Sequence, residues 1–131
     1  MACEKDYAVI VAGGGHAGCE AALAASRMGA RTLLITMKKS AIGYTSCNPA
    51  IGGTGKGQIV KEIDALGGEM AKAADASCIQ YRMLNSSKGY AARSSRMQID
   101  RKLYNSYMLE KILSSPRLDV AEDEVTEVIV R

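Results

Sequence analysis

The stretch YAVIVAGGGHAG, residues Tyr7–Gly18, decides the fold class of this chain. It opens with a continuous apolar run, Tyr7–Ala12, and continues into a run of glycines. A short apolar run bounded by glycines is typical of a strand that is buried on both faces of a parallel sheet. The alanine-rich segment Ala17–Met28 comes next and predicts a helix that ends at Gly29.

A second buried strand is predicted directly after this helix. Residues Arg31–Met37 have the sequence RTLLITM, which is apolar and partly β-branched. The first 37 residues therefore predict a β-α-β unit. Such a unit is typical of an α/β protein with a Rossmann-like parallel sheet, so we expect that fold class.

The glycines at positions 13, 15 and 18 have the G-x-G-x-x-G spacing of dinucleotide-binding loops. Gly13 permits a tight turn, Gly15 lets the backbone approach a pyrophosphate, and Gly18 lets the helix lie close to the strand. The start of the helix adds N–H groups and a positive dipole, which favour phosphate. The alternative is a tight turn that binds nothing. The position of the glycines between a strand and a helix favours the dinucleotide site.

The end of the second strand lacks the acidic residue that dinucleotide-binding proteins use to hold the ribose. Thr36 stands in that position, and its hydroxyl can still hydrogen-bond a ribose. This difference weakens an NAD interpretation and leaves FAD or a variant site. His16 lies at the start of the helix, where a packing or phosphate-proximal role is favoured over a general acid.

The rest of the chain predicts further elements of one α/β unit, without a repeat or a domain linker. We expect a long loop, two helices, a half-exposed strand, a longer helix and two final strands, at Lys38–Gly57, Gln58–Leu66, Glu69–Ala76, Cys78–Leu84, Ser95–Ser114, Leu118–Val120 and Val125–Val130. Ser94 or Ser95 is expected to cap the longer helix.

The composition fits one ordinary domain. The chain has 131 residues, of which 47% are hydrophobic and 24% charged, a balance that excludes a disordered chain. Its apolar runs are far shorter than the ~20 residues that cross a bilayer, and Met1–Tyr7 has no signal or transit pattern. We therefore expect a soluble, cytoplasmic protein without membrane contact. The four cysteines contain no C-x-x-C pair and there is one histidine, so we expect free thiols and no metal site.

The loop segment GYTSCNPAIGGTGKG, Gly43–Gly57, combines a cysteine with closely spaced glycines. It fails the Walker A pattern, because Ala50 and Gly57 stand where a glycine and a Ser or Thr are required. Its consecutive glycines are suited to present N–H groups to an anion or a flavin edge. Cys47 lies in a polar setting near Lys56, which is compatible with a reactive thiolate. The residues alone leave a catalytic and a non-catalytic role of Cys47 equally open.

Four segments together resemble the N-terminal part of the glucose-inhibited division protein A family: GGGHAGCEAALAASRMGARTLLIT, SCNPAIGG-x-GKG, VKEIDALGG and DRKLY. The similarity covers nearly all 131 residues, and the SCNPAIGG segment is highly specific. Tyr90 departs from the family, which usually has proline after Ser-Lys-Gly. The resemblance implies that residues 1–131 are the N-terminal part of an FAD-binding Rossmann-like domain, incomplete because the family's downstream domains are absent.

The resemblance also implies an activity. The family is the FAD-containing subunit of the enzyme that places a carboxymethylaminomethyl group on the wobble uridine of tRNA. Reduced flavin would work with methylene-tetrahydrofolate as carbon donor and with glycine or ammonium, and NADH would serve as reductant. The implied partners are tRNA, a tRNA-modification GTPase subunit and, for the full-length protein, a second copy in a homodimer.

The functional residues of the family correspond to particular positions in this chain. The implied catalytic residue is Cys47, as a nucleophile or acid/base on the uridine ring. Together with the strand-end Thr36, the candidate cofactor-binding residues are Gly13, Gly14, Gly15, His16, Ala17, Gly18 and, through its backbone, Val125.

The stretch Arg82–Lys102 is locally basic, with six Lys and Arg residues and a single acid, Asp100, for a charge of +5. Such a segment suits contact with phosphates, although a solvated face is the alternative that the residues alone favour. With the tRNA substrate that the resemblance implies, Lys88, Arg93 and Arg96 become candidates for RNA or flavin-phosphate contact.

Two further interpretations stay open. The first is a relative of the flavin- and folate-dependent tRNA uridine methyltransferases, whose early sequence is also Rossmann-like, although the SCNPAIGG segment argues against it. The second is a truncated FAD-binding fragment without catalytic activity.

Overall fold

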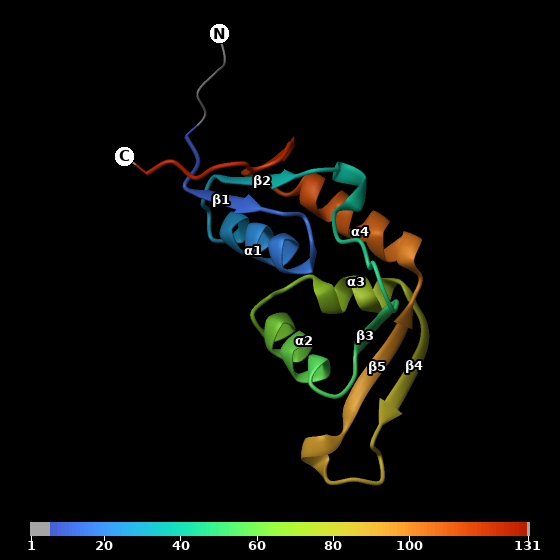
Figure 1. The fold of residues 1–131 in the computed structure, drawn as a ribbon. Coiled ribbons are helices and arrows are strands. Elements are labelled where there is room, and N and C mark those ends of the chain that lie inside the picture. The colour runs from blue at the N-terminus through green and yellow to red at the C-terminus, as the bar shows by residue number, and fades with distance from the viewer. Residues whose placement is uncertain (1–5, 131) are drawn as a thin grey trace. The chain divides into compact units, whose positions relative to one another are not determined.

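The computed structural model describes residues 6–130, which form two compact units (Figure 1). The first unit contains the residues up to 43 and from 109 onward, and the second contains residues 44–108. The boundary at residue 109 falls inside helix α4, Arg101–Ser114, so this helix contributes residues to both units. None of the helices in the described part of the chain is both long and apolar enough to cross a membrane.

The first unit is a parallel three-stranded sheet with a helix against it. Its strands lie in the order β1-β2-β6 and span Val9–Ala12, Thr32–Thr36 and Leu118–Glu122. Both neighbouring pairs of strands are parallel. Helix α1, His16–Arg27, connects β1 to β2 and contacts both, and a 3-10 helix, Lys39–Ala41, follows β2 (Figure 1). This arrangement confirms the predicted α/β class with a Rossmann-like parallel sheet.

Helix α1 buries a face of mostly small residues against this sheet. Four residues at the i, i+3, i+4, i+7 spacing of one helix face are buried: Cys19, Ala22, Leu23 and Ser26. Leu34, in the middle of β2, is fully buried as well. The helix ends next to Gly29, as predicted, and the φ of +89° at Gly29 is a left-handed conformation that favours glycine.

The second unit combines an antiparallel three-stranded sheet with two short helices. The strands lie in the order β3-β5-β4 and span Ala50–Gly52, Ser94–Ile99 and Cys78–Leu84. Strands β4 and β5 form a long hairpin, drawn in yellow and orange in Figure 1. Helix α2, Lys56–Ala65, contacts β3 and β5, and helix α3, Met70–Ala76, contacts β5. The predicted strand Cys78–Leu84 is confirmed.

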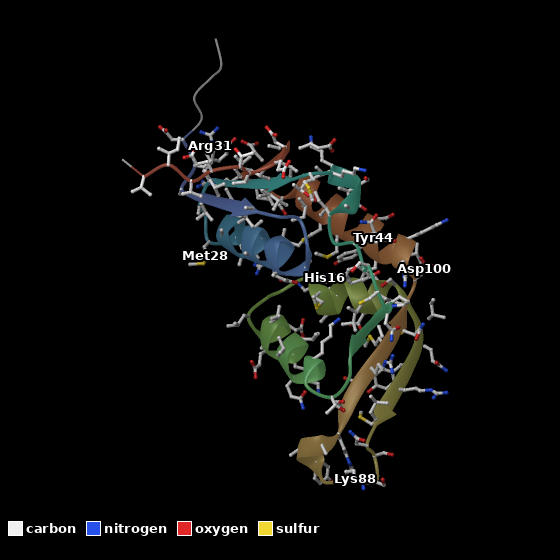
Figure 2. The ribbon with its side chains drawn as sticks, viewed as in Figure 1. His16, Met28, Arg31, Tyr44, Lys88 and Asp100 are labelled. Carbon is white, nitrogen blue, oxygen red and sulfur yellow. The ribbon has the colours of Figure 1, made fainter. Side chains whose placement is uncertain are left out.

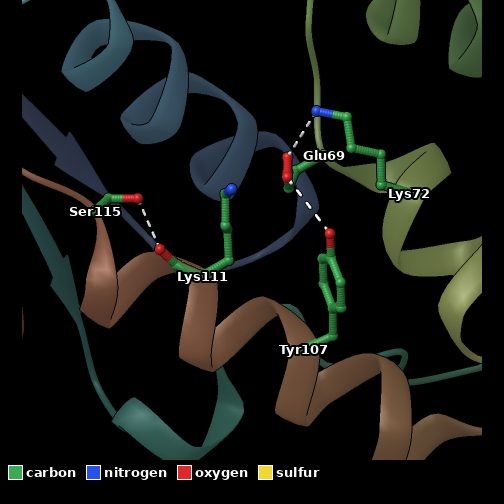
Figure 3. Close-up of polar contacts among 5 residues, drawn as sticks. All are labelled: Glu69, Lys72, Tyr107, Lys111 and Ser115. Carbon is green, nitrogen blue, oxygen red and sulfur yellow. Dashed lines mark hydrogen bonds and ion pairs between the residues drawn. The ribbon is translucent and has the colours of Figure 1, made fainter.

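A buried carboxylate precedes α3 in the second unit. Glu69 is 2% exposed and makes polar contacts with two side chains (Figure 3). Lys72 Nζ lies 3.3 Å from Glu69 Oε2, and the Tyr107 hydroxyl donates a hydrogen bond to Glu69 Oε1 over 3.5 Å. Because a buried carboxylate without partners is costly, these contacts stabilise Glu69 in its buried position.

The predicted helix from Ser95 is wrong in its first residues. Residues Ser94–Ile99 form the central strand β5, and α4 begins only at Arg101. Asp100 caps this helix, because its Oδ1 accepts hydrogen bonds from the N–H groups two and three residues later, at 2.8 and 3.0 Å. The N-cap was predicted at Ser94 or Ser95 and is instead Asp100.

The predicted strand Val125–Val130 is also wrong. The structure assigns no strand there, and Val128, Ile129 and Val130 are exposed. An apolar run forms a strand only where a neighbouring strand satisfies its backbone groups, and none of residues 6–130 does so. Conversely, Ala50–Gly52, which lies in the predicted loop, forms β3 because it pairs with residues 96–98 of β5.

Candidate functional site

A cavity of about 350 Å³ lies at the carboxyl ends of the strands of the first unit. Ligands of open α/β sheets bind at this edge. The cavity is lined by the ends of the three strands and the segments that follow them: Ala12, Gly13, Gly14, Gly15, Ile35, Thr36, Met37, Ala41, Asp123, Glu124 and Val125. Five of the candidate cofactor-binding residues therefore line the same cavity: Gly13, Gly14, Gly15, Thr36 and Val125. Val125 does so although it is not in a strand.

The chain turns between β1 and α1 at two glycines. Gly13 has a φ of +103°, which favours glycine, and its N–H donates to the Ile35 carbonyl oxygen on β2 at 2.8 Å. Gly14 is buried, and a Cβ at this position would lie 2.9 Å from Thr36 Oγ1. Its carbonyl oxygen accepts the Gly43 N–H at 2.8 Å. The fold itself therefore requires glycine at both positions.

Gly15 and Gly18 have opposite surroundings. A Cβ at Gly18 would overlap the carbonyl oxygen of Gly13, so glycine lets the first turn of α1 lie against the loop. A Cβ at Gly15 would meet no protein atom within 4 Å, and the φ of −73° at Gly15 suits any residue. The fold therefore does not require glycine at position 15, which lines the cavity.

The first turn of α1 starts beside this loop at His16 and Ala17. Figure 2 labels His16, which is half-buried at the start of the helix. The first turn carries no acidic side chain, so nothing in it opposes an anion at the positive end of the helix dipole. The loop and the helix start together form a surface suited to a phosphate group.

Carboxylates reach the cavity from β6 rather than from β2. Parallel pairing aligns Thr36 with Glu122, and the Asp123 N–H donates to the Thr36 carbonyl oxygen at 2.9 Å. Asp123 and Glu124 consequently line the cavity beside Thr36, whose own Oγ1 is buried and donates to the Lys38 carbonyl oxygen over 3.5 Å. Neither acid was predicted as a site residue, because the strand predicted at Leu118–Val120 ended two residues too early and no local signal placed it beside β2.

Cys47 lies in the second unit, in the loop before β3. Its side chain is exposed and its thiol is free. The Cys47 carbonyl oxygen accepts a hydrogen bond from the Arg101 side chain at the start of α4. Lys56 Nζ donates to the carbonyl oxygen of Ala50 at 3.3 Å. Side chains thus bond the backbone carbonyl groups of Cys47 and Ala50, while the Cys47 thiol stays accessible.

The glycines that follow Cys47 use their N–H groups within the chain. The acceptors are the carbonyl oxygen of Ser95 for Gly53 (2.7 Å), Gln58 Oε1 for Gly55 (3.1 Å) and the carbonyl oxygen of Gly53 for Gly57 (2.7 Å). The prediction that these glycines present N–H groups to an anion or a flavin edge is therefore wrong for all three.

The three candidate RNA-contacting residues lie on the β4–β5 hairpin of the second unit. Lys88, labelled in Figure 2, is in the turn, where its N–H donates to the Asn85 carbonyl oxygen at 2.9 Å. The guanidinium carbon of Arg93 lies 4.4 Å from the centre of the Tyr90 ring, and Arg96 is on β5. The structure thus places Lys88, Arg93 and Arg96 on one supersecondary element.

The described cysteines Cys19, Cys47 and Cys78 are free thiols, and Cys3 lies outside the described residues. Cys19 is fully buried and its thiol donates to the Gly14 carbonyl oxygen at 3.4 Å. Burial raises the pKa of the Cys19 thiol to about 11, which makes this cysteine unreactive at neutral pH. Within residues 6–130, no group of three or more His, Cys, Asp or Glu side chains could hold a metal ion.

Comparisons with known proteins identify close relatives of this chain. The family model described as "Glucose inhibited division protein A" matches residues 8–131. The tRNA uridine 5-carboxymethylaminomethyl modification enzyme MnmG of Geobacter sulfurreducens is 58% identical over 127 residues, which are 97% of this chain and 20% of that protein. The enzyme of the same name from Chlorobium chlorochromatii is 61% identical over 122 residues, which are 93% of this chain and 20% of that protein.

Solved structures share the fold of this chain. GidA from Aquifex aeolicus has a TM-score of 0.95 at 50% identity, over 100% of this chain and 22% of that chain. The p-nitrophenol 4-monooxygenase PnpA from Pseudomonas putida, at 12% identity and a TM-score of 0.56 over 86% of this chain and 30% of that chain, is similar in fold alone. The chain spans about a fifth of the length of the curated relatives it matches. Matched over residues 8–131, it belongs to the glucose-inhibited division protein A family.

Proposed function

We propose that this chain is the FAD-binding portion of an enzyme that adds a carboxymethylaminomethyl group to carbon 5 of the tRNA wobble uridine. The observation that carries the proposal is the cavity at the carboxyl ends of β1, β2 and β6, where an added Cβ at Gly15 meets no protein atom. Relatives with more than half of their aligned residues identical are named as enzymes of this modification, which favours it over uridine methylation.

The residues around the cavity suit a dinucleotide. The pyrophosphate of FAD would lie against the backbone of residues 13–15 and the start of α1 at His16 and Ala17. The carboxylates of Asp123 and Glu124 are available to accept hydrogen bonds from ribose hydroxyls, in place of the acid missing from β2. The backbone of Val125 would add a further contact. The flavin, when bound and reduced, supplies electrons for the modification.

Cys47 is the proposed catalytic residue, as a nucleophile or acid/base on the uridine ring. Two observations support this role. The thiol is free and exposed, and Arg101 holds the backbone of its loop through the Cys47 carbonyl oxygen. A reactive thiol needs access to its substrate and a fixed position, and this loop provides both.

The remaining proposals concern the whole protein, because this chain spans about a fifth of its relatives' length. The family resemblance supports NADH as reductant, methylene-tetrahydrofolate as carbon donor, a GTPase subunit as partner, a homodimer, and a cytoplasmic location with tRNA. Lys88, Arg93 and Arg96 would contact the tRNA, and their common position on the β4–β5 hairpin supports this.

FAD binding is tested with Gly15→Ala. The added methyl group meets no protein atom, so the variant should fold as the wild type does. Gly15 lines the cavity, and a methyl group there should obstruct a pyrophosphate that lies against the backbone of residues 13–15, so the dissociation constant for FAD should rise at least about tenfold. Quenching of flavin fluorescence on titration measures the affinity, and circular dichroism measures the unfolding temperature.

Gly89→Ala is the matched control. Gly89 also has open space around its Cβ position and an ordinary φ of −58°, but it lies in the hairpin turn of the second unit. This variant should bind FAD as tightly as the wild type. Unchanged FAD affinity in Gly15→Ala, or an equal loss in both variants, would contradict the proposed site.

A further inference from the structure

The β4–β5 hairpin, residues 78–99, carries charge of a single sign. It contains no Asp or Glu and four basic residues: Arg82, Lys88, Arg93 and Arg96. Lys88, Arg93 and Arg96 are the predicted RNA contacts, and Arg82 is the fourth basic residue of the hairpin. A segment with one sign of charge creates a local positive potential that attracts phosphates.

Arg82 and Arg96 face each other across the hairpin. The antiparallel register pairs Arg82 with Arg96 and Gln80 with Gln98. Side chains of directly opposed residues lie on the same face of a sheet, with Cβ atoms ~5 Å apart, and like charges in this position are destabilising. Within residues 6–130, the structure records no carboxylate paired with either guanidinium. The pair therefore does not stabilise the hairpin through an ion pair.

The same side chains line a hollow of about 170 Å³, which is bounded by Gln80, Arg82, Leu84, Arg96 and Gln98. A guanidinium can only donate hydrogen bonds, and its planar fork matches two oxygens of a phosphate. The glutamine amides can donate or accept, as recognition of a sugar hydroxyl requires. The hollow is therefore suited to a ligand with several acceptor oxygens and negative charge.

Several contacts stabilise the turn of this hairpin. Asn85 Nδ2 donates to Thr54 Oγ1 at 3.3 Å and to the Ala92 carbonyl oxygen at 3.0 Å. The guanidinium of Arg93 is placed over the Tyr90 ring. The ring contact limits the freedom of the Arg93 side chain, so less entropy is lost there when a ligand binds.

We propose that this hairpin binds the phosphodiester backbone of RNA, with the paired guanidinium groups of Arg82 and Arg96 as its centre. The inference rests on the proposed tRNA substrate and assigns that substrate a surface. Paired arginines with flanking amides favour a polymer of phosphates and ribose hydroxyls over a lipid surface, because Leu84 is the single apolar residue of the hollow.

The test is the salt dependence of binding to an unmodified tRNA transcript, measured by fluorescence anisotropy between about 50 and 200 mM salt. Each of Arg82→Gln and Arg96→Gln should reduce the slope of log affinity against log salt by about one. The loss of affinity over that range should therefore shrink about three- to fourfold. Neither variant should unfold at a lower temperature, because each removes a like-charge contact.

Two further variants sharpen the result. Arg82→Lys keeps the charge and loses the fork, so it should keep the slope and bind more weakly. Lys61→Gln removes the same charge from an exposed position on α2, outside the hairpin, and should leave tRNA binding unchanged. No measurable binding by the wild type, unchanged slopes in both arginine variants, or an equal effect of Lys61→Gln would overturn the proposal.

Two parallel measurements separate this inference from its alternatives. If the arginine variants bind phosphatidylserine vesicles more weakly than the wild type does but bind tRNA equally well, the surface binds lipid and the RNA proposal is wrong. FAD titration of the same preparations tests the proposed cofactor site separately. If the arginine variants bind FAD as tightly as the wild type and show the same salt dependence of tRNA binding, the RNA surface is refuted and the cofactor site is not.

Discussion

Gly13, Gly14 and Gly18 are glycines because the chain itself needs a left-handed φ or leaves no space for a side chain, whereas neither reason applies to Gly15. The G-x-G-x-x-G spacing includes Gly13, Gly15 and Gly18 and places no requirement on Gly14. The structure shows the difference at Gly15, which lines the cavity and where an added Cβ would meet no protein atom within 4 Å. At the scale of single residues, this glycine gives the strongest structural support for the proposed dinucleotide site.

Cys19 should make the stability of the chain depend on pH in the alkaline range. Burial raises the pKa of its thiol from 9.0 to about 11, so the unfolded chain loses this proton first as the pH rises. The thiol's contribution is complete below about pH 9 and is lost as the pH rises to about 11. The free energy of unfolding should therefore fall by up to roughly 2–3 kcal/mol over this range.

Urea unfolding at about pH 8 and pH 10.5 measures this effect in the wild type and in Cys19→Ala. The stability difference between the two proteins should shrink at the higher pH, because the variant lacks the titrating thiol. Cys78→Ala removes an exposed thiol and serves as the control, in which the difference should stay constant. A constant difference for Cys19→Ala as well would contradict the assignment.

At the scale of elements, the sequence predicted those helices and strands whose own residues carry a clear pattern. Helix α1 and strand β4 agree with the sequence, because an alanine-rich stretch between glycines and an alternating strand carry their own patterns. Strands β3 and β5 do not. The short Ala50–Gly52 becomes a strand by pairing with β5, and SSRMQI in Ser94–Ile99 becomes one by pairing with both β3 and β4. Such pairing joins residues far apart in the chain, and a local window cannot show it.

Asp100 should contribute measurably to the stability of α4. Its carboxylate accepts two N–H groups of the first turn, so Asp100→Ala should lower the free energy of unfolding by about 1 kcal/mol. Asp100→Asn keeps an acceptor at the same place and should stay within a few tenths of a kcal/mol of the wild type. Urea unfolding midpoints measure both, and equal stability of all three proteins would rule out the cap.

At the scale of the whole molecule, the α/β class and the family followed from the first 37 residues and the specific segments, while part of the site did not. The structure places Gly13, Gly14, Gly15, Thr36 and Val125 in one cavity. Their roles in binding FAD stay predictions. Asp123 and Glu124 could not be anticipated, because they reach the cavity only through the position of β6 beside β2.

The most direct test of the proposed cofactor site is to titrate FAD into the ¹⁵N-labelled chain and record the chemical shift of each amide. The site includes the glycine loop at residues 13–15 and the start of α1. Saturable shifts should appear at residues 13–17, at Asp123 and Glu124, and at Val125, which surround the cavity and the start of α1. The amides of the β4–β5 hairpin should stay unchanged at the same FAD concentrations. An absence of saturable shifts at residues 13–17, or shifts confined to the hairpin, would contradict the cofactor site.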